Sequence, residues 1–128
     1  MIKFQHTKHR ALWGMIISML LDLDKDISSA AKLKLDAFDE LYAGYDEPLC
    51  TCYACAYDED INDMFPDENR PEDCVNCPLS WPDDKVCDIS DSLYANFVDA
   101  CHNKDRKAAV KYAIDIRDCP VKKDVETE

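Results

Sequence analysis

The chain has 128 residues, of which 47% are hydrophobic, and its 27 acidic and 15 basic residues give a formal net charge of −12. This length suits one compact domain with a single core. So acidic a surface repels phosphate backbones, which disfavours nonspecific nucleic-acid binding over most of it. The two glycines leave positive-φ turns short of their usual residue, so we expect a mainly α fold rather than an all-β one.

The longest apolar run, "ALWGMIISMLL" at residues 11–21, is too short to cross a bilayer. Basic residues precede it, as in a signal peptide, but Asp22, Asp24 and Asp26 follow where a cleavage site of small residues should lie. The run is therefore predicted to belong to a core helix over about 8–21, in a cytoplasmic protein. Its inner face is expected to carry Leu12, Ile16, Met19, Leu20 and Leu23, widened by Trp13, Ile17 and Leu21.

A second helix is expected to begin after Ser28 or Ser29, either of which can cap it, and to end before Gly44. Its predicted inward residues are Ala30, Leu33, Ala37, Phe38 and Leu41. Helical periodicity then stops from 45 to 86, and six of the eight cysteines lie between 50 and 87. So long an irregular stretch needs something other than an apolar core to order it.

Periodicity returns in a third helix that Ser90 or Asp91 can cap, followed by a fourth helix that ends before Pro120. The inner faces are predicted to hold Leu93, Tyr94, Phe97, Val98 and Cys101 in the third helix, and Ala108, Ala109, Tyr112, Ala113 and Ile116 in the fourth. The expected organisation is one helical domain over 1–119 with a zinc-binding insert at 50–87, and a disordered tail over 120–128.

Four cysteines of the middle segment have the spacing of a zinc site: two C-x2-C pairs separated by eighteen residues. A two-residue spacer lets both thiolates of a pair face one ion at about 2.3 Å, and two pairs complete a tetrahedron. We expect a pair of zinc knuckles, or a small β-hairpin around them, holding a structural Zn²⁺. The predicted ligands are Cys52, Cys55, Cys74 and Cys77, with Cys50 and Cys87 as alternates.

Other uses of the cysteines fit less well. Disulfides belong mainly to secreted chains, and neither pair lies in a strand-to-helix unit of the thioredoxin type. An iron–sulfur cluster stays open, although the compact C-x2-C-x2-C run of bacterial ferredoxins is missing. Cys101 and Cys119 are expected to be core thiols on helical faces. His6 and His9 could ligate together but lack a third ligand, so capping or surface roles are expected for them and for His102.

The sequence contains no G-x-S-x-G, phosphate-binding loop or H-E-x-x-H motif, and a closed four-thiolate site leaves no position for substrate or water. We therefore expect a binding protein rather than an enzyme. The loop between the cysteine pairs is strongly acidic, and a solvated loop is the simplest interpretation. Its candidate partner-binding residues are Asp58, Glu59, Asp60, Asp63, Asp67 and Glu68.

The motifs "KHRALW", "CYACAY", "CVNCPLSW" and "IRDCP" resemble an uncharacterised family of small cysteine-rich proteins of phages and prophages of Gram-positive bacteria. The family pattern, C-x2-C with an aromatic and then C-x2-C-P-L-x-W, falls on Cys52, Cys55, Tyr57, Cys74, Cys77, Pro78, Leu79 and Trp81. The chain departs from it at the additional Cys50 and at Cys119, where an aliphatic residue is expected. The resemblance implies a phage origin, a bacterial host cytoplasm and zinc, but no activity.

Three functions follow as hypotheses. The first is an interaction protein that occupies the basic nucleic-acid channel of a host protein, such as a defence nuclease or a polymerase, which the charge and the implied phage origin favour. The second is a nucleic-acid-binding regulator that uses the zinc segment or the basic residues at 104–111. The third is a structural module of a larger assembly that docks through the wide apolar face of the first helix.

Overall fold

The computed structural model describes residues 3–42, 77–81, 92–123 and 125–127. Within these ranges the chain forms four helices: α1 (His6–Leu21), α2 (Ala30–Tyr42), α4 (Leu93–His102) and α5 (Arg106–Arg117). The same ranges contain two isolated β-bridges and no longer strand. The expected mainly α fold with about four helices is therefore confirmed for the described residues. Most of the insert at 50–87 lies outside them, except 77–81.

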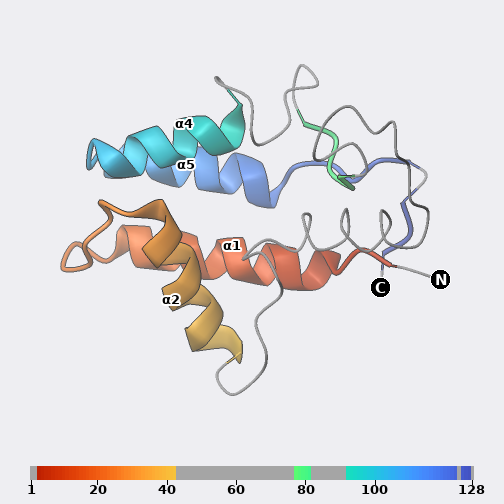
Figure 1. The fold of residues 1–128 in the computed structure, drawn as a ribbon, viewed down its shortest axis with the longest axis horizontal. Coiled ribbons are helices and arrows are strands. Elements are labelled where there is room, and N and C mark those ends of the chain that lie inside the picture. The colour runs from red at the N-terminus through yellow and green to blue at the C-terminus, as the bar shows by residue number, and fades with distance from the viewer. Residues whose placement is uncertain (1–2, 43–76, 82–91, 124, 128) are drawn as a thin grey trace, which may run out of the picture.

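The helices form two layers with one helix set across them (Figure 1). α4 and α5 lie side by side, joined by a short turn, and α1 packs along α5. α2 leaves the end of α1 at a steep angle and contacts both α1 and α4. None of the helices in the described ranges combines the length and apolarity that a membrane span would need.

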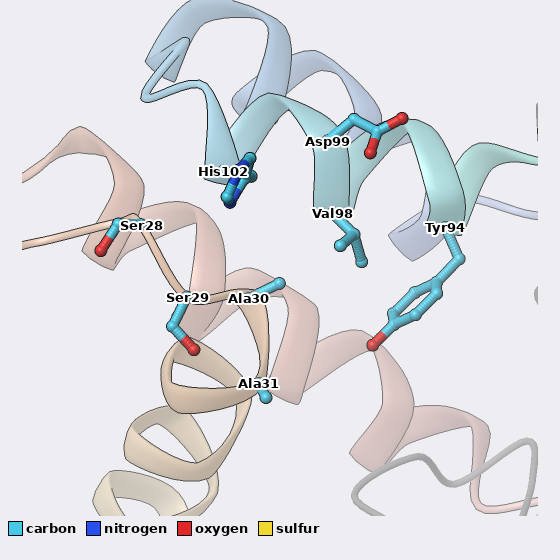
Figure 2. Close-up of a pocket in the computed structure, with 8 residues that line it drawn as sticks. All are labelled: Ser28, Ser29, Ala30, Ala31, Tyr94, Val98, Asp99 and His102. Carbon is cyan, nitrogen blue, oxygen red and sulfur yellow. The ribbon is translucent and has the colours of Figure 1, made fainter.

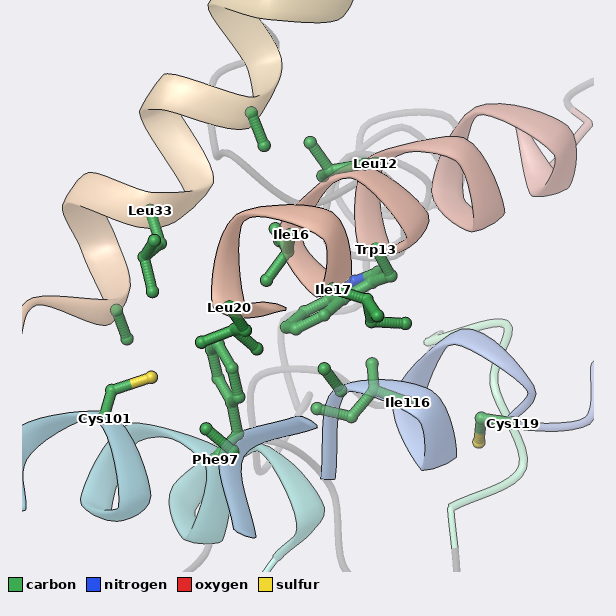
Figure 3. Close-up of a cluster of buried hydrophobic side chains, with 14 of the residues drawn as sticks. Leu12, Trp13, Ile16, Ile17, Leu20, Leu33, Phe97, Cys101, Ile116 and Cys119 are labelled. Carbon is green, nitrogen blue, oxygen red and sulfur yellow. The ribbon is translucent and has the colours of Figure 1, made fainter. Parts of the chain in front are cut away.

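The core lies between these layers (Figure 3). The Trp13 ring of α1 and the Phe97 ring of α4 form a T-shaped pair at a centroid distance of 5.1 Å, a favourable aromatic arrangement. The apolar face predicted for the first helix is confirmed at Leu12, Trp13, Ile16, Ile17 and Leu20, which are buried. The prediction is wrong at Leu21 and Leu23, which are exposed. Leu23 follows the end of α1, so helical spacing no longer directs it inward.

Side-chain caps fix the starts of the other helices. Ser29 Oγ accepts a hydrogen bond from Lys32 N at 3.2 Å, which confirms one of the two predicted caps of α2. At α4 the cap is Ser92, whose Oγ accepts from Ala95 N at 3.1 Å. Ser90 and Asp91, the predicted caps, lie outside the described residues. Asp105 caps α5 through Ala108 N.

The segment after α5 is paired with two distant parts of the chain. Phe4 N donates to Glu126 O at 2.8 Å beside a parallel bridge between Phe4 and Thr127. Val121 forms an antiparallel bridge with Leu79. These contacts differ from the disordered tail expected over 120–128, because the backbone groups at 120–122 and 126 have partners elsewhere in the fold. Both ends of the described chain consequently lie at the same end of the molecule (Figure 1).

Candidate metal centre

Cys77, one of the four predicted zinc ligands, lies where segment 77–81 pairs with the residues that follow α5. Ser80 N donates to Pro120 O at 2.7 Å, and Lys122 N donates to Pro78 O at 2.8 Å. The pairing is reciprocal. Each segment contains a Cys-Pro dipeptide, and the backbone N–H two residues after each proline donates to the carbonyl of the proline in the other segment. Two Cys-Pro dipeptides, 77–78 and 119–120, are thus held in one antiparallel pair.

The sulfur of Cys77 accepts a hydrogen bond. Its side chain is buried, with 3% of the residue exposed, and Trp81 Nε1 donates to Cys77 Sγ at 3.4 Å. The indole N–H can only donate, so the Cys77 sulfur acts as the acceptor. A donor that points at sulfur stabilises a thiolate more than a thiol, and such outer partners are typical of metal-bound cysteines. The surroundings of Cys77 therefore fit a metal ligand.

Cys119 is the second sulfur at this place, and the sequence interpretation did not find it. We expected Cys119 on the inner face of a helix, but α5 ends at Arg117. The Cys119 thiol, 4% exposed, donates to Ser80 O at 3.2 Å. Burial, followed by the charge of the nearby Cys77, raises the pKa of Cys119 to about 12. The repeated Cys-Pro dipeptide is the sequence signal that could have linked the two residues.

Cys101 behaves as predicted, as a thiol of the apolar core. It is buried in α4, and burial raises the pKa of its thiol to about 11. Cys101 and Cys119 lie at opposite ends of the buried cluster in Figure 3. The two thiols therefore differ in surroundings, since Cys119 borders a second cysteine and Cys101 borders apolar side chains of the helices.

The remaining predicted site residues lie outside the part of the chain that the structure describes. They are the ligands Cys52, Cys55 and Cys74, the alternates Cys50 and Cys87, and the candidate partner surface of Asp58, Glu59, Asp60, Asp63, Asp67 and Glu68. Among the described residues, no group of three or more His, Cys, Asp or Glu side chains is arranged to hold a metal ion. The zinc quartet accordingly remains a prediction, with one of its members placed.

His9 is a buried residue and not the surface or capping group expected. Its Nε2–H donates to Ile116 O at 3.1 Å, and the same carbonyl accepts from Cys119 N at 3.2 Å. Its Nδ1 is buried without a hydrogen-bond partner in the described ranges. Desolvation, the largest effect, lowers the pKa of His9 to about 4, so the ring is neutral at physiological pH. The His6 ring stacks against it at a centroid distance of 6.3 Å.

A separate surface groove of about 380 Å³ lies between the start of α2 and one face of α4 (Figure 2). Its floor is formed by small and aliphatic side chains such as Ala30 and Val98. Asp99 and His102 also line it, but one carboxylate and one imidazole do not form a set of groups of one charge that would select a charged ligand. The groove therefore lacks the converging polar groups that mark a specific ligand site.

No protein-family model matches the chain, and no significant match is found among the curated proteins or the solved structures.

Proposed function

We propose that the chain is a small acidic protein whose central segment is held together by one zinc ion and which acts by binding another protein. The observation that carries the metal part is the buried Cys77 sulfur, which accepts the indole N–H of Trp81 in a segment fixed to the end of α5. The proposed ligands are Cys52, Cys55, Cys74 and Cys77, with Cys50 and Cys87 as alternates. Their spacing favours zinc over an iron–sulfur cluster.

The proposed role of the metal is structural. Four thiolates fill a tetrahedral ion and leave no position for a water or substrate. Structural zinc contributes about 10–16 kcal/mol to the folding of finger peptides. A contribution of that order offsets the entropy cost of ordering an irregular segment of low apolar content. Zinc would thus supply the stability that hydrophobic burial supplies among the helices.

Charge supports the choice of a protein partner. A net charge of −12 on 128 residues complements a basic surface and speeds association with it. We propose a host protein with a basic nucleic-acid-binding channel, such as a defence nuclease, as the partner of a phage protein in the bacterial cytoplasm. The acidic loop between the cysteine pairs is the proposed contact, through Asp58, Glu59, Asp60, Asp63, Asp67 and Glu68.

Direct nucleic-acid binding through residues 104–111 is less favoured, because part of this basic set is already engaged. The Arg106 guanidinium donates to four backbone carbonyls, those of Leu20, Asp22, Leu23 and Lys25. Lys111 pairs with Asp115 at 3.5 Å. Docking through the apolar face of the first helix has less support as well, since most of that face is buried in the core of the chain itself.

Two measurements test the proposed function. Metal analysis of the purified chain is expected to find about one zinc per chain, and zinc far below that level would overturn the metal part. Capture from bacterial host lysate at low salt is expected to retain a nucleic-acid-binding protein that high salt releases, because an acidic contact is screened by salt. Recovery of no partner at low salt, together with a salt-sensitive shift of labelled DNA or RNA, would favour the nucleic-acid regulator instead.

A further inference from the structure

We propose that Cys119 is a ligand of the same metal ion as Cys77, so that the chain just after α5 forms one wall of the metal centre. This inference deepens the proposed function and rests on its zinc site. It adds a ligand 42 residues after Cys77 in the sequence, which the C-x2-C spacing does not reveal. It also changes what the metal does, because the ion would join the central segment to the helical domain.

The first support is the backbone pairing that brings the two cysteines to one place. The bonds from Ser80 N to Pro120 O and from Lys122 N to Pro78 O fix segments 77–81 and 119–122 against each other. The Cys119 sulfur contacts Ser80 O, while the Cys77 sulfur contacts the ring of Trp81, the next residue. Both sulfurs therefore face one short segment of chain, and both are buried.

The chemistry of the two donors is the second support. Thiolates are soft ligands that suit zinc, and a buried thiol becomes an anionic ligand only when a cation compensates its charge. Two neighbouring buried thiols supply two of the sulfur donors that a structural zinc site needs. A zinc ion takes four ligands in a structural site. With Cys119 included, one of Cys52, Cys55 and Cys74 would then lie outside the first coordination sphere.

A path to Cys119 from solvent is the third support. A shallow pocket of about 230 Å³ has Cys119 and Pro120 in its wall, together with Leu93, Asp115 and Asp118. Asp118 already pairs with Arg10 at 3.1 Å and with Arg117 at 3.0 Å, so it is not offered as a ligand. The pocket brings solvent next to Cys119, and a metal site requires an entry path.

The decisive experiment uses the full wild-type chain loaded with an NMR-active cadmium isotope, which replaces zinc at thiolate sites. Through-bond couplings between cadmium and cysteine Hβ protons identify each ligating cysteine. Cross-peaks are expected from Cys77 and Cys119 and not from Cys101, which serves as the internal control in the core. Because the measurement needs no substitution, it does not depend on the folding of a variant.

A variant experiment gives an independent readout. Cobalt is titrated into Cys119→Ser and into the matched control Cys101→Ser, and the thiolate-to-cobalt charge-transfer absorbance is followed. Cys119→Ser is expected to lose about one quarter of the absorbance, as one of four thiolates, and to bind cobalt at least about tenfold more weakly. Weaker binding alone would fit a positioning residue, whereas the lost absorbance reports a lost ligand.

The outcomes separate the two proposals. Cadmium cross-peaks from four other cysteines, with none from Cys119 and full cobalt absorbance in Cys119→Ser, would overturn this inference and leave the zinc proposal intact. No binding of cadmium or cobalt by the wild-type chain would overturn both. A Cys77–Cys119 disulfide, seen as a mass two hydrogens lower that persists in the purified chain, would replace the metal at this corner and overturn the inference too.

Discussion

His9 in α1 and Ile116 in α5 are joined by a buried hydrogen bond, in which Nε2–H of the imidazole donates to the backbone carbonyl at 3.1 Å. Only 1% of His9 is exposed, and its Nδ1 has no hydrogen-bond partner among the described residues. The bond holds the start of α1 against the last turn of α5, one turn before Cys119. The neighbouring His6 and Arg10 side chains add to desolvation in lowering the pKa of His9.

Acidification is expected to destabilise the fold through His9. Its pKa is lowered from 6.5 to about 4, so between these values the unfolded chain binds more protons than the folded one. The free energy of unfolding therefore falls as pH drops through this window, by up to about 3 kcal/mol, and this contribution is constant below it. Urea unfolding of the wild type between about pH 7 and pH 4.5 measures the loss.

His9→Gln tests the assignment, because a glutamine amide can donate to the carbonyl of Ile116 but does not titrate in this range. The variant is expected to lose most of the pH dependence in the same window. His102→Gln, at an exposed position, serves as the matched control and should keep it. An unchanged pH profile in His9→Gln would show that another group carries the effect.

Arg106 is expected to stabilise the turn that follows α1. Its guanidinium donates to Leu20 O at 3.0 Å and Asp22 O at 2.9 Å, and it also contacts the carbonyls of Leu23 and Lys25. The end of a helix leaves carbonyls without intrahelical partners, and a cation there is favourable. Arg106→Lys keeps the charge but loses the planar fork of donors, so we expect a loss of about 2 kcal/mol in the free energy of unfolding.

The matched control is Lys107→Ala at the next, exposed position of α5, for which a change within about 0.5 kcal/mol is expected. Chemical denaturation of both variants with the wild type gives the comparison. Equal stability of Arg106→Lys and the wild type would show that these bonds contribute no more than the water they replace.

Lys104, in the turn between α4 and α5, has a φ of 57°, in the left-handed region that favours glycine. Lys104 N donates to Cys101 O and Asp105 N donates to Ala100 O, which is the Schellman pattern at a helix end. A residue with a Cβ is strained in this conformation. Lys104→Gly is therefore expected to raise the free energy of unfolding by roughly 0.5 to 1 kcal/mol, after allowance for the entropy of glycine in the unfolded chain.

Lys107→Gly is expected to lower the free energy of unfolding, the opposite of the effect expected for Lys104→Gly. Lys107 lies within α5, where glycine is less favourable than most residues, so a loss of up to about 1 kcal/mol is expected. Thermal or urea unfolding of the two glycine variants together is the test. A loss of stability in Lys104→Gly would mean that contacts of the lysine side chain outweigh the relief of strain.

The helices could be predicted from the sequence because their determinants are local. Apolar periodicity and a capping serine placed α2 at its observed start, and the same period identified Phe97 and Cys101 as inward residues of α4. Leu23 shows where this reasoning fails, since the apolar periodicity continues in the sequence after the helix has ended. The carbonyl of Leu23 accepts a hydrogen bond from Arg106, which is 83 residues away in the sequence.

The residues that the sequence interpretation misplaced depend on contacts between distant segments. Nothing near His9 in the sequence indicates that the Ile116 carbonyl accepts a hydrogen bond from its ring, and nothing near Cys119 indicates that Ser80 lies beside it. A disordered tail was expected over 120–128 because chain ends are often poorly ordered, yet backbone groups of Pro120, Lys122 and Glu126 pair with residues at 78–80 and at Phe4. Backbone pairing of this kind is not limited to apolar segments, so hydropathy does not reveal it.

Removal of zinc is expected to lower the stability of the helical domain as well as that of the insert, because Cys77 lies in a segment paired with the end of α5. A strong chelator should lower the melting temperature of the wild type, and added zinc should restore it. Cys77→Ser should melt at the low temperature with or without chelator, since it loses a ligand that both proposed ligand sets contain. Cys101→Ser, a substitution in the core away from the proposed site, should be destabilised by a similar amount with and without chelator and so retain the zinc response. Unchanged melting of the wild type with chelator would contradict the prediction, and loss of the zinc response in Cys101→Ser would show that the response does not depend on ligand identity.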